Sequence, residues 1–136
     1  MPAIVRIEKA SFGAGAWKRE DFLRYLFDPE RSIFLVAAAD GKVAGYVIGF
    51  ITGTRAEVDS IAVTPSRRGV GIAGAIMTRL RQMLQRRGVT TISLTVRVNN
   101  TAAIGLYRKL GFRRERRIND YYEDGAPAWR MKSALG

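Results

Sequence analysis

The residues of this sequence that are best suited to hold an anion lie between positions 61 and 74. Gly69 and Gly71 follow Arg67 and Arg68, and a helical pattern begins directly after them. Unpaired N–H groups and the dipole at a helix N-terminus favour an anion, and glycines let the backbone approach a pyrophosphate closely. The pattern predicts a phosphate-binding turn. The alternative is a glycine-rich turn that only changes the direction of the chain and binds no ligand.

The same glycines satisfy the G-x-G-x-x-G pattern of dinucleotide-binding folds over residues 69–74. That fingerprint places its first glycine directly after a strand and an acidic residue about 20 positions further on. Here residues 64–68 separate the strand pattern from Gly69, and the next strand ends at Val98 without an acid. A dinucleotide site is therefore disfavoured, although Arg97 could accommodate a 2′-phosphate.

Positive charge is concentrated in the same part of the chain. The 136 residues carry a net charge of +11, and the segment 65–117 alone holds 13 Lys and Arg residues against one acid, Glu115. A segment of such strong positive charge indicates an anionic ligand, such as nucleic acid or a polyphosphate. The alternative is a solvated basic face that aids solubility.

The residue types that the chain lacks exclude other kinds of chemistry. It contains no Cys and no His, so it has no thiolate nucleophile, no disulfide and neither of the commonest transition-metal ligands. We therefore expect no metal site. No apolar run approaches the ~20 residues of a membrane-spanning helix. The N-terminus lacks a signal-peptide pattern, so the expected compartment is the cytoplasm.

Hydrophobic periodicity and turn residues predict the elements that position these groups. The length fits one domain, residues 1–136. Asp40 and Gly41 predict a tight hairpin turn. The strand, helix and strand within 58–98 should form a right-handed parallel crossover, and the other strands suit antiparallel pairing, so we expect an α/β protein with a mixed sheet. The predicted helices cover residues 2–11, 18–27, 71–87 and 100–110, and the predicted strands cover residues 33–38, 43–52, 58–63, 89–98, 112–118 and 128–132.

Two ordered signatures resemble those of a known family. Residues 68–73 fit the pattern Q/R-x-x-G-x-G/A, and residues 100–112 fit N-x-x-A-x-x-L-Y-x-x-x-G-F. Both are typical of the GNAT superfamily of N-acetyltransferases, and the resemblance covers nearly the whole chain. It is closest to the ribosomal-protein-alanine N-acetyltransferase group, because residues 117–122 resemble that group's tyrosine-bearing peptide-binding loop.

The resemblance implies a GNAT fold, in which a mixed, mostly antiparallel sheet contains a splayed parallel pair and carries flanking helices. The strand ending at Val63 would diverge from the strand ending at Val98. The strand that precedes the first helix in this family has no counterpart in the sequence. We therefore expect residues 33–38 to form a sheet edge, across which a homodimer could assemble.

The resemblance also implies a site for acetyl-coenzyme A, the acetyl donor. The pantetheine would lie in the gap between the diverging strands, and the amides of the glycine-rich loop would hold the pyrophosphate. Asn100 would bind the coenzyme, cap the following helix, or do both. The cofactor-binding residues implied in this way are Ile61, Ala62, Val63, Arg68, Gly69, Val70, Gly71, Ile72, Ala73, Gly74, Asn100, Tyr107 and Lys109.

The implied reaction is a direct attack of a primary amine on the thioester carbonyl. Tyr107 would protonate the leaving thiolate, unless it is a core aromatic. Similar enzymes carry a Glu base at the position of Thr95, whose neutral hydroxyl can at most orient a water, so the identity of the base here is open. Glu57 and Asp59 share one face of their strand, and we take Glu57 as the candidate base, the alternative being that both are solvated carboxylates.

The expected acceptor is the N-terminal α-amine of a protein or peptide, for example a ribosomal protein. An α-amine has a pKa of about 7.7–8.0, so a useful fraction is neutral at physiological pH, whereas a Lys amine at about 10.4 is almost fully charged. The resemblance assigns substrate contacts to Phe12, Trp17, Tyr121 and Tyr122. Two alternatives remain: an acetyltransferase of small-molecule amines, and a non-catalytic basic module that binds RNA or the ribosome.

Overall fold

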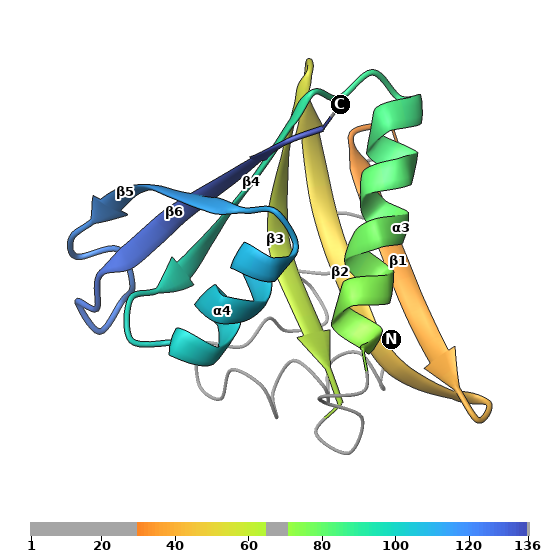
Figure 1. The fold of residues 1–136 in the computed structure, drawn as a ribbon, viewed down its shortest axis with the longest axis horizontal. Helices are drawn as coiled ribbons and strands as arrows, with labels where there is room; N and C mark the ends of the chain where they lie inside the picture. The colour runs from red at the N-terminus through yellow and green to blue at the C-terminus, as the bar shows by residue number, and fades with distance from the viewer. Residues whose placement is uncertain (1–29, 65–70, 136) are drawn as a thin grey trace.

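Six strands form a single sheet in the computed structural model, which describes residues 30–64 and 71–135. The strand order is β1-β2-β3-β4-β6-β5, and the two helices of the described residues pack against the sheet (Figure 1). The helices predicted at 2–11 and 18–27 lie outside the described residues. The elements are β1 (Ser32–Ala39), β2 (Lys42–Thr52), β3 (Arg55–Val63), α3 (Ile72–Arg86), β4 (Thr91–Arg97), α4 (Thr101–Lys109), β5 (Arg113–Ile118) and β6 (Ala128–Ala134).

The predicted mixed sheet is confirmed, with modest changes at element ends. Strand β3 begins three residues before the predicted 58–63, and β6 extends two residues beyond the predicted 128–132. The hairpin between β1 and β2 turns at Asp40 and Gly41, whose φ angles of 52° and 76° are both left-handed. Two consecutive positive φ angles are what a two-residue hairpin loop requires.

The parallel pair β3 and β4 separates part of the way along its length. The two strands pair from Arg55 opposite Thr91 to Val58 opposite Leu94, and no further. Residues 59–63 continue along β2 instead. Figure 1 shows the C-terminal ends of β3 and β4 diverging, as the predicted splay requires.

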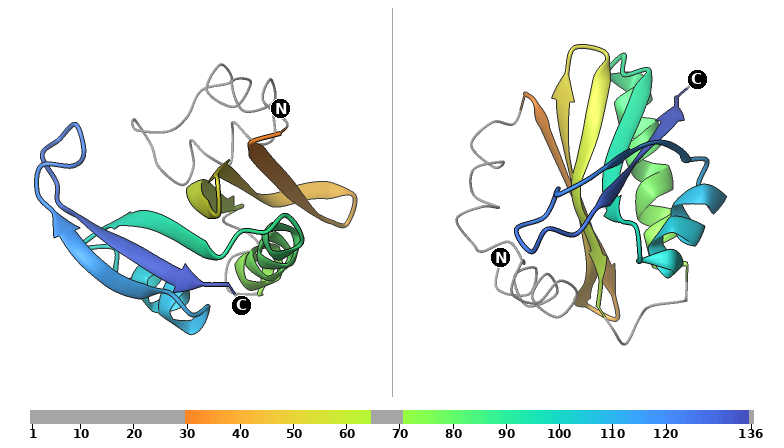
Figure 2. Two further views of the ribbon diagram at one scale, coloured as in Figure 1. Left: turned by 90° about the horizontal axis from the view of Figure 1, so that it is seen from above. Right: turned by 90° about the vertical axis from the view of Figure 1, so that its left-hand side faces the viewer.

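One face of the sheet is covered by α3 and α4, and the core lies beneath them (Figure 2). Helix α3 buries Ile76, Met77, Leu80 and Leu84, a spacing that keeps them on one side of the helix. They pack on alternate strand residues such as Val58, Ile92 and Leu94. Each such side chain contributes roughly 1.5–3 kcal/mol by leaving water. No helix in the described part of the chain is both long and apolar enough to cross a membrane.

Arg81 connects α3 to the far end of α4 and to β6. Its Nη2 donates to the carbonyl oxygen of Leu110 at 2.6 Å and to Oγ of Ser133 at 2.8 Å. The guanidinium also lies over the ring of Phe112, 5.0 Å from its centroid. Burial lowers the pKa of Arg81. This clamp fixes the position of the helix that carries Tyr107.

Candidate active site

The first component of the site is the gap between β3 and β4. Because pairing ends at Val58 and Leu94, the last part of β3 is separated from β4. The predicted cofactor residues Ile61, Ala62 and Val63 lie on this segment, and the first of them is half-buried. A slender chain with amide groups can therefore lie along this edge of β3 and pair with it as an added strand would.

The second component is the N-terminus of α3, at the same end of the molecule as the diverging strands (Figure 1). Gly71 caps the helix with φ 82° and ψ 7°, a left-handed conformation. Among the described residues no side chain caps the helix, and its first turn holds no acid. The first-turn amides, which include the predicted residues Ile72, Ala73 and Gly74, lack helical acceptors and suit a pyrophosphate. The predicted residues Arg68, Gly69 and Val70 lie outside the described part of the chain.

The third component is α4. Asn100 is its N-cap, and Asn100 Oδ1 accepts a hydrogen bond from the Ala103 amide at 3.2 Å, so the capping role is confirmed. Tyr107 packs edge-on against Phe112, with ring centroids 6.0 Å apart. Burial, followed by the nearby Tyr122, raises the pKa of Tyr107 to about 12. Its phenol thus keeps its proton at neutral pH. Lys109 is exposed in the last turn.

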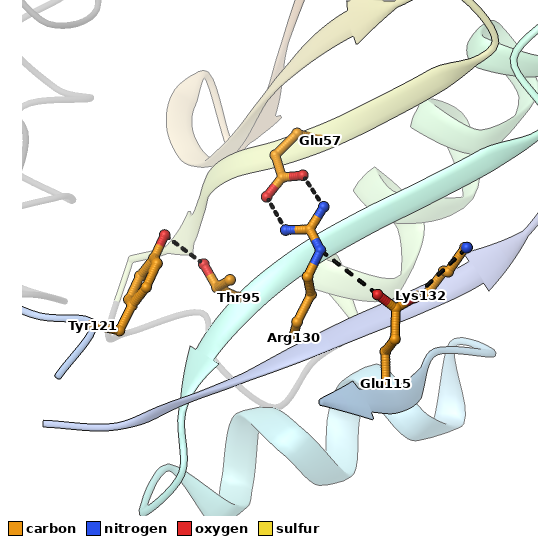
Figure 3. A network of polar contacts seen from close by, with 6 residues as sticks. All are labelled: Glu57, Thr95, Glu115, Tyr121, Arg130 and Lys132. Atoms are coloured by element: carbon orange, nitrogen blue, oxygen red, sulfur yellow. Dashed lines mark hydrogen bonds and ion pairs between the residues drawn. The ribbon is translucent and has the colours of Figure 1, made fainter. Parts of the chain in front are cut away.

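On the face of the sheet opposite the helices, Glu57 is held by Arg130 (Figure 3). The guanidinium Nη1 and Nη2 donate to Oε1 and Oε2 of Glu57 at 3.0 and 2.9 Å. Hydrogen bonding to Glu57 raises the pKa of Arg130. Glu115 lies 4.0 Å from Nε of Arg130 and 3.6 Å from Nζ of Lys132. The four charges form one chain across the sheet.

Sequence reasoning missed the pairing of Glu57 with Arg130 and the extension of this network to Glu115 and Lys132. Residues 73 positions apart carry no local signal of contact. Strand alternation also gives the wrong partners on β5, because its register with β6 shifts between Arg114 and Arg116. This β-bulge leaves Glu115 as the extra residue and re-aims its neighbours.

The loop after β5 is attached to the end of β4. Oγ1 of Thr95 donates to the phenol oxygen of Tyr121 at 3.3 Å. The rings of Tyr121 and Tyr122 meet edge to face at 4.9 Å. Arg97 lies 4.2 Å over the Tyr122 ring and pairs with Asp124 at 3.0 Å. The two predicted tyrosines therefore lie beside the diverging end of β4, while Phe12 and Trp17 are outside the described residues.

A gap between splayed strands, a helix N-terminus without acids and a protonated tyrosine are the features that the sequence leads us to expect of an acetyl-coenzyme A-dependent acetyltransferase. Comparison with known proteins gives the same class. The model of the acetyltransferase (GNAT) family matches residues 1–112. The chain belongs to this family, and acetyl-coenzyme A is its acetyl donor.

Individual relatives support the assignment. A Pectobacterium atrosepticum protein named as an acetyltransferase is 41% identical over 106 residues, which are 71% of this chain and 75% of that protein. The crystal structure of the ribosomal-protein-S18-alanine N-acetyltransferase from Escherichia coli is similar with a TM-score of 0.88 at 32% identity, covering 99% of this chain and 87% of that one. Nourseothricin acetyltransferase is similar with a TM-score of 0.76 at 31% identity, covering 80% and 68% of the two chains.

Proposed function

We propose that this acetyltransferase modifies the N-terminal α-amine of a protein or peptide. The observation that carries the proposal is the attachment of Tyr121 to Thr95, which holds the Tyr121 and Tyr122 loop at the diverging end of β4. Paired aromatic rings with polar tips suit an extended peptide backbone, since they offer apolar contact and hydrogen bonds together. The similarity to the Escherichia coli enzyme over 99% of the chain supports the same acceptor class, and a ribosomal protein is one candidate.

We assign binding of the acetyl donor to backbone amides of α3 and β3 and to polar side chains of α4. Acetyl-coenzyme A supplies an acetyl group activated as a thioester. The first-turn amides of α3 hold the pyrophosphate, with Arg68, Gly69 and Val70 preceding them in the chain. The backbone at Ile61–Val63 aligns the pantetheine by strand-like pairing. Asn100 and Lys109, at the two ends of α4, contribute further polar contacts.

Glu57 takes the proton of the incoming amine. Both of its oxygens accept from Arg130, but an ionised carboxylate has about four lone-pair sites. Two sites therefore stay available to an amine or to a bridging water. The demand on this base is small, because an α-amine with a pKa of about 7.7–8.0 is already partly neutral at physiological pH.

Tyr107 supplies the proton that the leaving sulfur needs. Its pKa of about 12 keeps the phenol protonated under all assay conditions. The half-buried ring is fixed against Phe112, so the hydroxyl is held in one place. Positioned acids and bases of this kind contribute about 10²–10⁴-fold in rate.

The test compares two peptides, assayed separately, whose sequences match except at one position. One has a free N-terminus and no lysine, and the other is blocked at its N-terminus and carries one Lys. We expect faster thiol release from acetyl-coenzyme A with the first peptide. Faster acetylation of the Lys peptide would refute the proposed acceptor.

A small-molecule amine is the second candidate acceptor. The 31% identity to nourseothricin acetyltransferase favours it, because that name gives no protein as acceptor. A polyamine and an aminoglycoside in the same assay measure this alternative directly. If peptides are acetylated faster than the polyamine and the aminoglycoside, small-molecule acetylation is excluded as the main activity.

A further inference from the structure

A hollow of about 560 Å³ lies on the sheet face opposite the helices, and Glu57 lines it. Residues from five strands, β2 to β6, form its walls. An acceptor whose amine reaches Glu57 must therefore place its next atoms at or inside this hollow. The charge and polarity of the residues that line the hollow therefore select among acceptors.

The walls carry more positive than negative charge. Arg55, Arg116, Arg130 and Lys132 line the hollow, against the carboxylates of Glu57 and Glu115. Both carboxylates are already paired. Glu57 pairs with Arg130, and Glu115 pairs with Arg130 and Lys132. Arg55 and Arg116 are exposed and make no ion pair with any acid in the described part of the chain.

The bulge at Glu115 places like charges opposite one another. After the register shift, Arg116 lies opposite Arg130 on the neighbouring strand. Like charges directly opposite across a strand pair destabilise a sheet. Glu57 and Glu115 offset part of this repulsion at Arg130, and an anionic ligand beside Arg116 would offset the rest.

We propose that this hollow is a subsite for an acidic side chain of the acceptor, an Asp or Glu at the second or third position of the acetylated peptide. The proposal rests on the peptide acceptor proposed above. Arg55 precedes Glu57 by two residues along β3, a span of about 7 Å at the usual rise of a strand. An extended peptide with its amine at Glu57 covers that span with its next two residues.

The experiment measures kcat/KM for peptides with a free N-terminal Ala that differ only at the second and third residues, which are both Glu, both Gln or both Lys. We expect the order Glu above Gln above Lys, with roughly a threefold to tenfold step for one exposed ion pair strengthened by its neighbours. The Glu preference should shrink as salt is added, because exposed charges are screened.

Two variants assign the effect to the hollow. Arg116→Gln should remove most of the Glu preference while leaving the kcat/KM of the Gln peptide nearly unchanged. Arg113→Gln makes the same charge change on the same strand, but Arg113 is not among the residues that line the hollow, so the preference should persist. Arg116→Glu should favour the Lys peptide.

Several results would overturn the inference. Equal turnover of the Glu and Lys peptides shows that the hollow does not select charge, while the peptide acceptor itself stands. Equal loss of preference in Arg113→Gln and Arg116→Gln assigns the effect to the net charge of the protein. Acetylation of polyamines but of no peptide shows that the proposed acceptor is wrong, and the subsite fails with it.

Discussion

Glu57 and Arg130 bridge two strands that are not neighbours. Strand β4 lies between β3 and β6 in the sheet, so the ion pair spans about 9–10 Å of backbone spacing. Ser93 and Thr95 face Glu57 and Arg130 in the registers of β4 with its neighbours, and these side chains are short enough to let the pair meet above them. The proposed base is thereby fixed in one orientation.

Replacing Glu57 by Gln should lower kcat, but by less than the about 10²–10⁴-fold of a fully required base, because part of the α-amine is already neutral. The loss should shrink as pH rises, because more of the acceptor amine is then neutral without help. Steady-state kinetics from pH 6 to 9, from about two units below to about one unit above the α-amine pKa, measure both effects. Glu115→Gln removes another carboxylate of the same network and should change kcat far less. Equal activity of Glu57→Gln and the parent protein across this range would leave water as the only base.

Tyr107→Phe should lower kcat by about 10²–10⁴-fold with little change in coenzyme A affinity, since the ring and its contact with Phe112 remain. A raised pKa means that the phenol loses its proton only near pH 12. The parent enzyme should therefore show no alkaline fall in kcat from this group below that value. Coenzyme A affinity comes from titration calorimetry. A fall in kcat titrating near pH 9 in the parent and absent from Tyr107→Phe would show that the pKa of Tyr107 is not raised, and an unchanged kcat in Tyr107→Phe would contradict its role as the acid.

Gly71→Val should abolish coenzyme A binding. Its φ of 82° is unfavourable for any side chain, and changing the first turn of α3 would misplace the amides assigned to the pyrophosphate. Gly53→Val is the matched control, because Gly53 has φ 61° and equally open surroundings, in the turn between β2 and β3. Both variants should lose about 1–3 kcal/mol of stability. Unchanged coenzyme A affinity in Gly71→Val would show that the loop assignment is wrong.

Arg81→Met should lower the free energy of unfolding by about 1–3 kcal/mol, because it removes the donor to Leu110 and Ser133. Arg79→Met, an exposed change in the same helix, should have little effect. Urea unfolding of the parent and the two variants measures this difference. Equal m values for the three proteins allow the midpoints to be compared as stabilities. A midpoint for Arg81→Met equal to that of Arg79→Met would show that the clamp contributes nothing.

Strand β1 is an edge among the described strands, and Val36 on it is 48% exposed. Unpaired edges template pairing with another chain, so we predict a homodimer across β1. Val36→Lys should dissociate it, because an edge lysine opposes strand addition. Sedimentation velocity over a concentration series reports the change. A parent protein that stays monomeric at high concentration would refute the dimer.

Much of the fold and part of the site follow from the sequence. The strands and α3 and α4 were predictable because their signals are local: apolar periodicity, the Asp40–Gly41 turn, and Asn100 as a cap for Ala103. The proposed pyrophosphate site near Gly71 is predictable for the same reason, since the unpaired amides of a helix N-terminus are a local feature. The two signatures at residues 68–73 and 100–112 identified the GNAT family.

Only the tertiary structure decided what surrounds Glu57. Its pairing with Arg130 depends on β6 lying next to β4, which no local pattern encodes. The bulge at Glu115 moves Arg116 opposite Arg130, whereas simple alternation along β5 places Glu115 there. The attachment of Tyr121 to Thr95 joins a loop to a strand end 26 residues away. Side-chain periodicity fixes which face a residue takes within its own strand, but strand order and register decide which charges share that face.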